Sequence, residues 1–296
     1  MRRLLSVLGL SSLLLGTAPA AAHEPLWGET PITFGFGVIH PEVKLMYFDA
    51  GTTRRGGERM RMFEQEYMVD YGISPRLNLR LEVPYHNSLH QTRLRGRLRS
   101  TFVSGLGDIT LRAKSRISAK QEVGYNMQQS VFFGVKLPTG DDTHPDPGGG
   151  RLEPHSQTGT GNPGLLLGYA WDLERLDDTT WASLVWTRDL GGGFRMGDML
   201  AFDAAYGYWT RPQREAADLG LNTALGIHAE WHSDDPLGGG RDADNRHGLL
   251  GLHLTQMVIR GSHQFRVGVM VPLARTGEAA HSDFPYELRV AFETFF

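Results

Sequence analysis

The sequence is notable first for what it lacks. It contains no cysteine, which excludes disulfide bonds and thiol chemistry. Beyond its N-terminal stretch it has no run of ~18 or more apolar residues, which excludes helical membrane spans. Its 30 basic and 33 acidic residues nearly balance, which gives no indication of a nucleic-acid partner. It also lacks a Gly-x-Ser-x-Gly element and a phosphate-binding or dinucleotide-binding glycine loop, so the common enzyme motifs are missing.

The first 22 residues have the three parts of a secretory signal peptide. Arg2 and Arg3 form a positive start, and an apolar stretch follows from Leu4 to Leu15. Residues 18–20 and 20–22 both fit the small-x-small rule for cleavage. We therefore expect this stretch to be removed when the protein is exported.

The mature chain is expected to divide into two parts. Residues 23–41 contain no clear alternation and are predicted to form an N-terminal periplasmic or plug-like segment. Residues 42–296 are predicted to form the main domain. If cleavage follows Ala20, His23 becomes the third residue of the mature chain, a position that suits square-planar copper(II); an accident of the alanine-rich cleavage site is the simpler explanation.

A period-two alternation of apolar and polar residues dominates the main domain. Residues 77–83 are an example, in which Leu or Val alternates with Asn78, Arg80 and Glu82. This period is the signature of a β-strand with one apolar and one polar face. It recurs in about twelve stretches, near 42–50, 63–71, 77–85, 108–117, 131–137, 165–173, 180–190, 198–210, 219–231, 247–259, 263–273 and 286–296.

The connections between these stretches alternate in length. Mostly short ones lie near 72–76, 118–125, 174–179, 211–217 and 260–262, and mostly longer ones near 87–104, 138–163, 191–197, 233–246 and 274–284. Short turns at one end and long loops at the other are typical of outer-membrane barrels, whose strands need ~9–11 residues. A soluble β-sandwich is the alternative, but its strands would be shorter, at about 5–6 residues. We predict an all-β fold, a transmembrane antiparallel up-and-down β-barrel of about 12 strands in the bacterial outer membrane.

The chain ends in YELRVAFETFF, an alternating stretch that finishes on Phe296. In a closed barrel the last strand must pair with the first, and a terminal aromatic would lie at the periplasmic interface. A terminal Phe on such a strand also resembles the signal that outer-membrane proteins present to their assembly machinery. The expected partners are therefore outer-membrane lipid, the barrel assembly machinery and a small-molecule solute, with no nucleic acid.

Three glycine-rich motifs resemble a known family. They are SGLGDITLRAKSRI at 104–117, GVKLPTGDD at 134–142 and TGTGNPGLLLGYAW at 158–171. Over about 65 residues they resemble the outer-membrane β-barrel family named for the meta-pathway of phenol degradation. The resemblance implies a transport barrel that passes apolar or aromatic small molecules. The motif residues themselves suit structural roles, since glycine relaxes the backbone and proline ends strand pairing, so the resemblance assigns no functional residue.

Charged residues of both signs occupy the faces opposite the apolar ones. A lumen lined in this way is either an open polar pore or a narrow interior filled by ion pairs, and a twelve-stranded barrel is intermediate in size between these cases. The residues predicted to line the lumen are Arg80, Glu82, Asp108, Arg112, Lys114, Arg116, Lys136, Glu230, Glu287 and Arg289.

Histidines gather toward the long-loop end of the predicted barrel. His228 and His232 flank Glu230 on one strand, and His247 would lie opposite His232 across a hairpin. Imidazole and carboxylate groups are ligands for zinc, copper or nickel. The two histidines of one strand would be about 13 Å apart, which favours a path of weak sites over one chelate. No resident cofactor is expected.

The leading functional hypothesis is an outer-membrane channel or transporter for small solutes, with aromatic or apolar compounds as the class that the resemblance implies. One alternative is a barrel that handles metal ions with its loop-side histidines. Another is a lipid-modifying enzyme or a non-conducting structural barrel. The pieces available to an enzyme are His86-Asn87-Ser88 and His232-Ser233-Asp234, which lie in or beside predicted loops. We therefore predict that the protein is not an enzyme.

Overall fold

The computed structural model describes residues 25–51, 58–94, 97–146, 150–152, 156–191, 197–213, 218–233, 246–276 and 284–296. The predicted signal peptide and His23 lie outside these residues. Within the described part of the chain, no helix is both long enough and apolar enough to cross a membrane.

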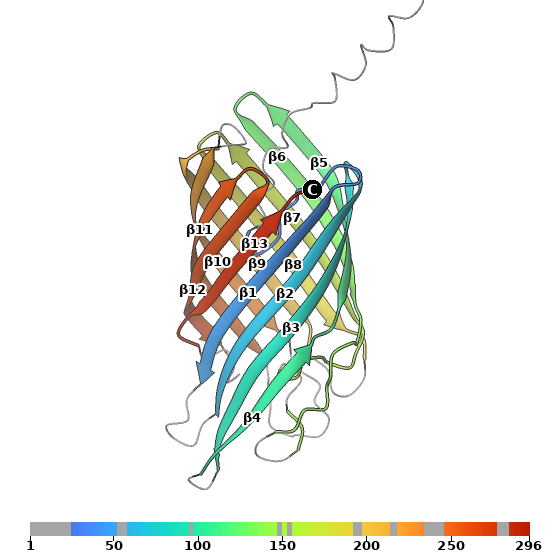
Figure 1. Cartoon of the computed structure of the whole chain (residues 1–296), viewed down its shortest axis with the longest axis vertical. Coiled ribbons are helices and arrows are strands. Elements are labelled where there is room, and N and C mark those ends of the chain that lie inside the picture. The colour runs from blue at the N-terminus through green and yellow to red at the C-terminus, as the bar shows by residue number, and fades with distance from the viewer. Residues whose placement is uncertain are drawn as a thin grey trace, which may run out of the picture.

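Antiparallel β-strands make up the structure (Figure 1). They are β1 (Ile39–Gly51), β2 (Glu58–Ser74), β3 (Leu77–Leu94), β4 (Arg97–Leu106), β5 (Thr110–Glu122), β6 (Tyr125–Lys136), β7 (Gly164–Arg175), β8 (Asp178–Asp189), β9 (Met199–Arg211), β10 (Leu219–His232), β11 (His247–Arg260), β12 (His263–Thr276) and β13 (Glu287–Thr294).

The strands close into a ring of twelve positions. Consecutive strands pair with each other except β4 and β5, and β1 pairs with β13. Strands β4 and β5 share one position, because β3 pairs with β4 along Tyr85–Leu94 and with β5 along Leu77–Glu82. Residues 107–109 interrupt this shared strand. The predicted barrel of about twelve strands is confirmed.

One predicted loop is wrong. Residues 87–104 are mostly strand, since β3 continues to Leu94 and β4 begins at Arg97. The stretch is rich in Arg and Ser, so its sequence does not alternate as a membrane strand does. Two paired strands satisfy their backbone groups with each other, and they need no apolar face once they extend beyond the membrane. The β3–β4 hairpin extends past the rim in this way (Figure 1).

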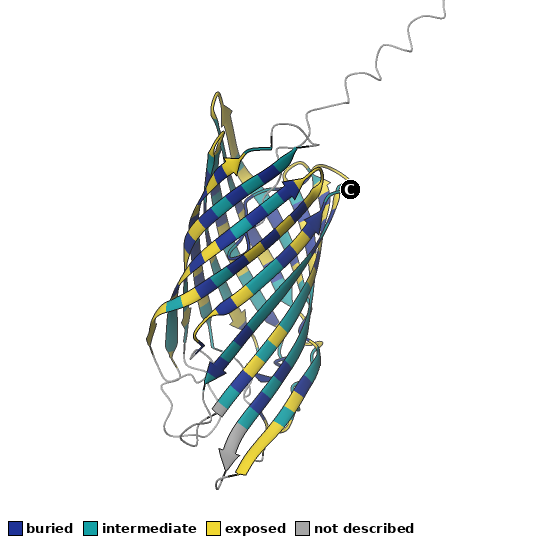
Figure 2. Ribbon diagram, turned by 60° about the vertical axis from the view of Figure 1, so that its left-hand side comes forward, coloured by how far each residue is buried: buried dark blue, intermediate teal, exposed yellow. Residues whose placement is uncertain are grey.

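Exposed and buried residues alternate along the strands (Figure 2). On β3, Leu79 and Leu81 are 47% and 41% exposed, whereas Arg80 between them is 3% exposed. The apolar residues therefore cover the outside and the charged residues fill the inside, the reverse of a soluble β-sandwich. Because a closed sheet with an apolar exterior suits a lipid bilayer, the chain is an outer-membrane β-barrel.

The two ends of the barrel differ. The start of β1 and the chain's C-terminus meet at one end, where Ile39 and Phe296 exchange backbone hydrogen bonds of 3.3 and 3.1 Å. The turns at this end are short, for example residues 75–76 and 261–262. The described residues of the connection between β6 and β7, 137–146, 150–152 and 156–163, lie at the opposite end (Figure 1). By the usual orientation of such barrels, the first end is periplasmic and the second faces outward.

Candidate functional site

A short segment ahead of β1 lies inside the barrel. It comprises residues 25–34, PLWGETPITF, and is called the lumen segment below. Most of its residues are buried. The Phe34 amide donates to Asn78 Oδ1 at 3.1 Å, the Thr33 hydroxyl donates to the Pro75 carbonyl at 2.8 Å, and Ser130 donates to the Pro31 carbonyl. These contacts join the segment to β3, to the β2–β3 turn and to β6.

The lumen segment turns at Gly28, against the wall formed by β8 and β9. Gly28 has a φ of 81°, a conformation that L side chains rarely adopt. A Cβ atom there would lie 2.6 Å from Asp203 Cβ and 2.7 Å from Ser183 Oγ. The next amide, of Glu29, donates to Ser183 Oγ at 3.0 Å. Only glycine allows the backbone to turn this close to the wall.

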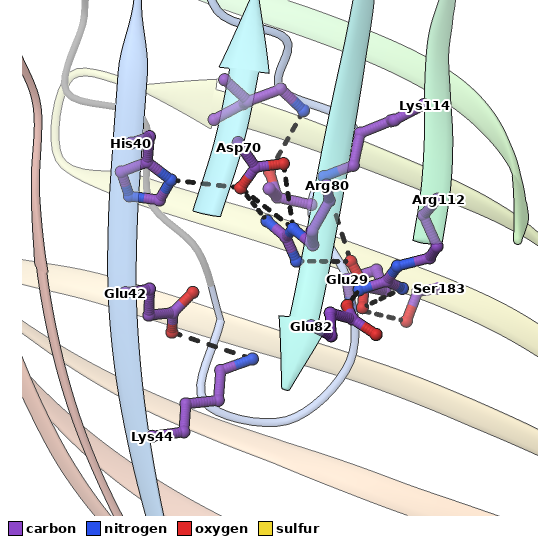
Figure 3. A network of polar contacts seen from close by, with 12 residues as sticks. Glu29, His40, Glu42, Lys44, Asp70, Arg80, Glu82, Arg112, Lys114 and Ser183 are labelled. Atoms are coloured by element: carbon purple, nitrogen blue, oxygen red, sulfur yellow. Dashed lines mark hydrogen bonds and ion pairs between the residues drawn. The ribbon is translucent and has the colours of Figure 1, made fainter. Parts of the chain in front are cut away.

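Glu29 enters a cluster of cations contributed by β3 and β5 (Figure 3). Its carboxylate lies 2.7 Å from Arg112 Nη1, 3.5 Å from Arg80 Nη1 and 3.9 Å from Lys114 Nζ. The side chain of Glu29 is only 11% exposed. Burial keeps water from screening these ion pairs, so Glu29 is a strong electrostatic anchor for the segment.

Carboxylates of the wall also enter this cluster. Arg112 pairs with Glu82, and Arg80 pairs with Asp70 at 2.7 Å. The lumen segment therefore adds Glu29 to a site in which the wall already supplies charges of both signs.

Trp27 fills a second anchoring site. Its ring stacks on His253 with the ring centroids 4.7 Å apart, and Arg289 Cζ lies 5.1 Å from the ring centroid. Arg289 Nη1 also donates to the Leu26 carbonyl at 3.3 Å. Gly268 leaves room for the ring, because a Cβ atom there would lie 2.6 Å from Trp27 Cζ3. The site therefore holds an aromatic ring between an imidazole and a guanidinium, an arrangement that favours aromatic groups.

Apolar side chains of the outer half of the barrel surround this ring. Leu26 and Trp27 pack in one cluster with residues of β1, β2, β12 and β13 and with Phe284. The buried wall members are Phe48, Ala50, Met60, Met270, Phe284 and Ala291. The lumen thus has an apolar zone on the outer side of a charged zone, and the segment contacts both.

A fully buried ion network joins the first and last strands. Arg266 of β12 lies 2.5 Å from Glu42 of β1 and 2.7 Å from Glu293 of β13. His40 lies 3.3 Å from Asp70 and 3.5 Å from Glu293. All of these side chains are at most 1% exposed, so the network ties the seam where the barrel closes.

The glycine-rich motifs hold an outer loop against the barrel mouth. Asp108 accepts the amide hydrogens of Gly140 at 3.0 Å and Thr160 at 2.9 Å. Gly140 and Gly159 are in backbone contact, and a Cβ atom on Gly140 would lie 2.6 Å from Gly159 Cα. Lys136 lies 2.5 Å from Asp189 and 3.5 Å from Asp108. The motifs at 104–108, 136–140 and 158–160 therefore form one clamp, called the loop clamp below.

One group in this loop has a shifted pKa. Asp141 accepts hydrogen bonds from the Thr143 hydroxyl at 2.6 Å and the Thr143 amide at 2.9 Å. Hydrogen bonds to the charged form lower the pKa of the Asp141 carboxyl below its ordinary value. The loop therefore keeps this negative charge in mildly acidic solution.

The predicted histidine cluster forms a chain of contacts. His228 Nδ1 lies 2.7 Å from Asp203 and its Nε2 lies 3.2 Å from Glu230. Glu230 also contacts His232, whose ring stacks on His247 with centroids 4.2 Å apart. The two histidines of β10 thus share one carboxylate. In the described part of the chain, no group of three or more such side chains has the arrangement of a metal site.

All ten residues predicted to line the lumen are now located. The residues around Glu29 are Arg80, Glu82, Arg112 and Lys114, and those in the loop clamp are Asp108 and Lys136. Glu287 and Arg289 pair beside Trp27, and Glu230 lies among the histidines. Arg116, near the periplasmic end, donates to the Pro75 carbonyl at 2.7 Å. These residues make ion pairs and hydrogen bonds, and they do not form a single ring of charges around the lumen.

The anchors of the lumen segment were not predicted from the sequence. Trp27 and Glu29 lie in a stretch without periodicity, so nothing in the sequence relates them to a distant strand. His253 offered a weak signal, because it is the one imidazole in the apolar run 248–254. A polar residue at an inward position of such a run marks the lumen, but it does not identify its partner.

The serine–histidine pairs are also located. Ser88 was predicted with His86, but its Oγ lies 2.9 Å from His90 Nε2, and both Ser88 and His90 are buried on the inward face of β3. His86 instead lies 3.0 Å from Glu64. Ser233 Oγ accepts the Asp198 amide hydrogen at 2.6 Å, and Asp234 lies outside the described residues. Ser88 therefore does not lie on the lipid-facing surface. The predicted group at Ser233 is only partly described.

Comparisons with known proteins agree with the fold. No family model and no curated protein sequence matches this chain, so the resemblance to the phenol-degradation family remains a prediction. An outer membrane channel from Pseudomonas putida F1 has a similar structure, with a TM-score of 0.65 and 15% identity over 90% of this chain and 97% of that chain. The β domain of the Bordetella autotransporter BrkA has a TM-score of 0.47 and 13% identity over 88% of this chain and 100% of that chain. At these identities the likeness is one of fold: this chain is a twelve-stranded outer-membrane β-barrel.

Proposed function

We propose that the protein is a passive outer-membrane channel for small solutes, and that the lumen segment closes it at rest. The observation that carries this proposal is the pair of anchors that the segment uses, Glu29 among three cations and Trp27 between His253 and Arg289. Both anchors are side chains that insert into the lumen, so the segment can leave without breaking any strand pair. The similarity to a channel of the same fold supports this role.

One small pocket lies beside the segment. A pocket between Pro25, Thr30 and Ile32 on one side and the wall at Asp172 and Trp181 on the other has a volume of about 20 Å³. A volume of this size accommodates about one water molecule. Because the segment itself lies buried inside the barrel, we infer that it moves when a solute passes.

We further infer that small aromatic solutes are among those that pass. The wall around Trp27 offers an imidazole face, a guanidinium and the apolar side chains of Phe48 and Met270. When Trp27 leaves, this surface faces the route of the solute. Stacking and cation–π contacts would then favour an aromatic ring over a sugar of similar size.

The test uses the purified barrel in planar bilayers and in liposomes. A variant lacking residues 25–34 keeps every strand, since β1 begins at Ile39. We expect small, brief openings in the parent protein and larger, sustained conductance in the variant. Liposomes with the variant should take up benzyl alcohol faster than a hexose. Silent bilayers from both proteins, each shown to be folded by its heat-dependent gel shift, would overturn the channel proposal.

The same recordings test the metal alternative. Zn²⁺ is added on the loop side before and after changing His228, His232 and His247 to Ala. Micromolar block that disappears in the triple variant would favour metal handling at the outer histidines. Conductance that is insensitive to Zn²⁺ would leave the small-solute channel as the sole transport hypothesis.

A further inference from the structure

The outer rim of β1 to β4 carries a group of side chains that the channel function does not use. On β2, Met60 is buried whereas Phe63 and Tyr67 are exposed on the lipid-facing side. Arg59 and Arg61 share the odd-numbered face with Phe63, so they also point outward. Both lie near the outer end of the strand, where the membrane surface is expected. We call Asp49, Arg59, Arg61, Leu89 and Phe102 the basic ledge.

The charges of the basic ledge do not cancel. Asp49 lies 2.5 Å from Arg59 Nη2 and 3.2 Å from Arg61 Nε, so one carboxylate serves two guanidinium groups. The two arginine side chains remain 33% and 44% exposed. Asp49 thus holds both groups in place, and the ledge keeps a net positive charge with outward N–H donors.

Apolar and polar groups continue the ledge across the neighbouring strands. Arg61 is opposite Leu89 of β3, and Leu89 is opposite Phe102 of β4, whose side chain is 64% exposed. One register step closer to the periplasm, Ser104 donates to Asn87 Oδ1 at 3.0 Å and lies 3.0 Å from the Tyr85 hydroxyl. The surface therefore combines cations, apolar side chains and outward hydroxyl and amide groups within a small area.

We propose that the basic ledge binds the phosphorylated glycolipid of the outer leaflet, the lipid A part of lipopolysaccharide. This molecule carries phosphates on a disaccharide that bears acyl chains. Arg59 and Arg61 match a phosphate, because guanidinium groups bind phosphate oxygens through paired hydrogen bonds. Phe63 matches the upper acyl chains, because it is exposed and lies one outward position closer to the periplasm than Arg61.

Another outward arginine at the rim serves as a comparison. Arg188 of β8 is 49% exposed and pairs with one carboxylate, Asp198, at 3.6 Å. One arginine with one carboxylate has no excess charge. Arg188 is therefore a matched control for an outward, rim-level guanidinium that does not belong to the ledge.

The experiment is native mass spectrometry of the full mature barrel released from detergent. The lipids are diphosphorylated lipid A and the same lipid after removal of its phosphates, and inorganic phosphate is tested separately. The double variants Arg59→Gln/Arg61→Gln and Arg59→Lys/Arg61→Lys are compared with Arg188→Gln. A heat-dependent gel shift establishes that each variant is folded.

We expect the parent and Arg188→Gln to retain diphosphorylated lipid A equally. Loss of both ledge cations should weaken retention at least ~10-fold, and the Lys pair should be intermediate because it keeps charge without the paired hydrogen bonds. Equal retention of lipid A without phosphates would overturn the proposal, as would equal retention by the Gln double variant. Competition by millimolar inorganic phosphate would show a site for free anions and would also overturn the assignment to lipid.

Discussion

The change of Glu29 to Gln is the sharpest test of how the lumen is closed. Gln keeps the shape of the side chain and can still donate to or accept from the wall, so packing is preserved. It removes the charge that faces Arg112 at 2.7 Å, Arg80 at 3.5 Å and Lys114 at 3.9 Å. The barrel wall is unchanged, so the effect should appear in the position of the lumen segment and not in strand pairing.

The magnitude follows from the charged hydrogen bonds that Gln would weaken. A hydrogen bond to a charged group contributes about 1.5–3 kcal/mol. The Gln amide would still meet the charged guanidinium groups, so what is lost is the ion pairing and not the whole bond. Arg112 and Arg80 keep their wall partners Glu82 and Asp70, so neither cation is left without an anion. We therefore expect docking of the segment to weaken by about 2 kcal/mol. That change raises the ratio of undocked to docked segment about 30-fold. An open probability on the order of 1% would rise to about a quarter.

Single-channel recording in planar bilayers measures this change directly. The control is Glu64→Gln, because Glu64 is a part-buried carboxylate paired with His86 of β3 at 3.0 Å and not with the lumen segment. We expect the control to keep the open probability of the parent protein. The reasoning is refuted if Glu29→Gln is correctly folded and its open probability equals that of the control.

Three further predictions concern the other anchors. Trp27→Ala should raise the open probability more than Trp27→Phe, because loss of a large buried ring costs about 3–5 kcal/mol whereas Phe can still stack; equal effects in bilayer recordings would contradict this. Arg266→Met should destabilise the barrel by about 3–5 kcal/mol, because two buried carboxylates lose their shared cation, and the gel shift should occur at a lower temperature. Gly159→Ala should release the loop clamp, because the added Cβ would strike Gly140; protease should cut residues 141–157 faster from the outer side, and an unchanged rate would argue against the clamp.

Much of the barrel could be predicted because a membrane β-strand follows a two-residue period. In β3, the alternation of Leu79, Arg80 and Leu81 predicts which side chains face lipid and which face the interior, and the exposed fractions agree. Closure by the last strand was also predictable, since a barrel leaves no free edge, and β1 does pair with β13. The two-residue alternation is lost where strands extend beyond the lipid. The β3–β4 hairpin illustrates this, since its strands continue past the rim with polar residues on both faces.

The lumen contacts could not be predicted for a different reason. Alternation shows that Arg112 points inward, but it does not show which carboxylate it meets. One of its two partners proved to be Glu29, which is 83 residues away in the chain. Likewise, the GLGD and PTG motifs indicated a structural role for Asp108, but only the folded loop shows that Asp108 binds the amides of Gly140 and Thr160. Contacts made by irregular segments have no period, so they are visible only in three dimensions.

The way in which the lumen segment is held has a consequence for its movement. The hydrogen bonds between the segment and the wall use wall side chains, as with Ser183, Asn78 and Ser130, or a side chain of the segment itself, as with Thr33. A strand of the barrel, by contrast, is held by a ladder of backbone bonds on both sides. The free energy that docks the segment is therefore concentrated in a few anchors, chiefly Glu29 and Trp27. Glu29 is connected to the buried network at Arg266 through Arg80, Asp70 and His40. The strands themselves are held by backbone pairing, so in the proposed function the lumen opens while the barrel stays closed as a ring.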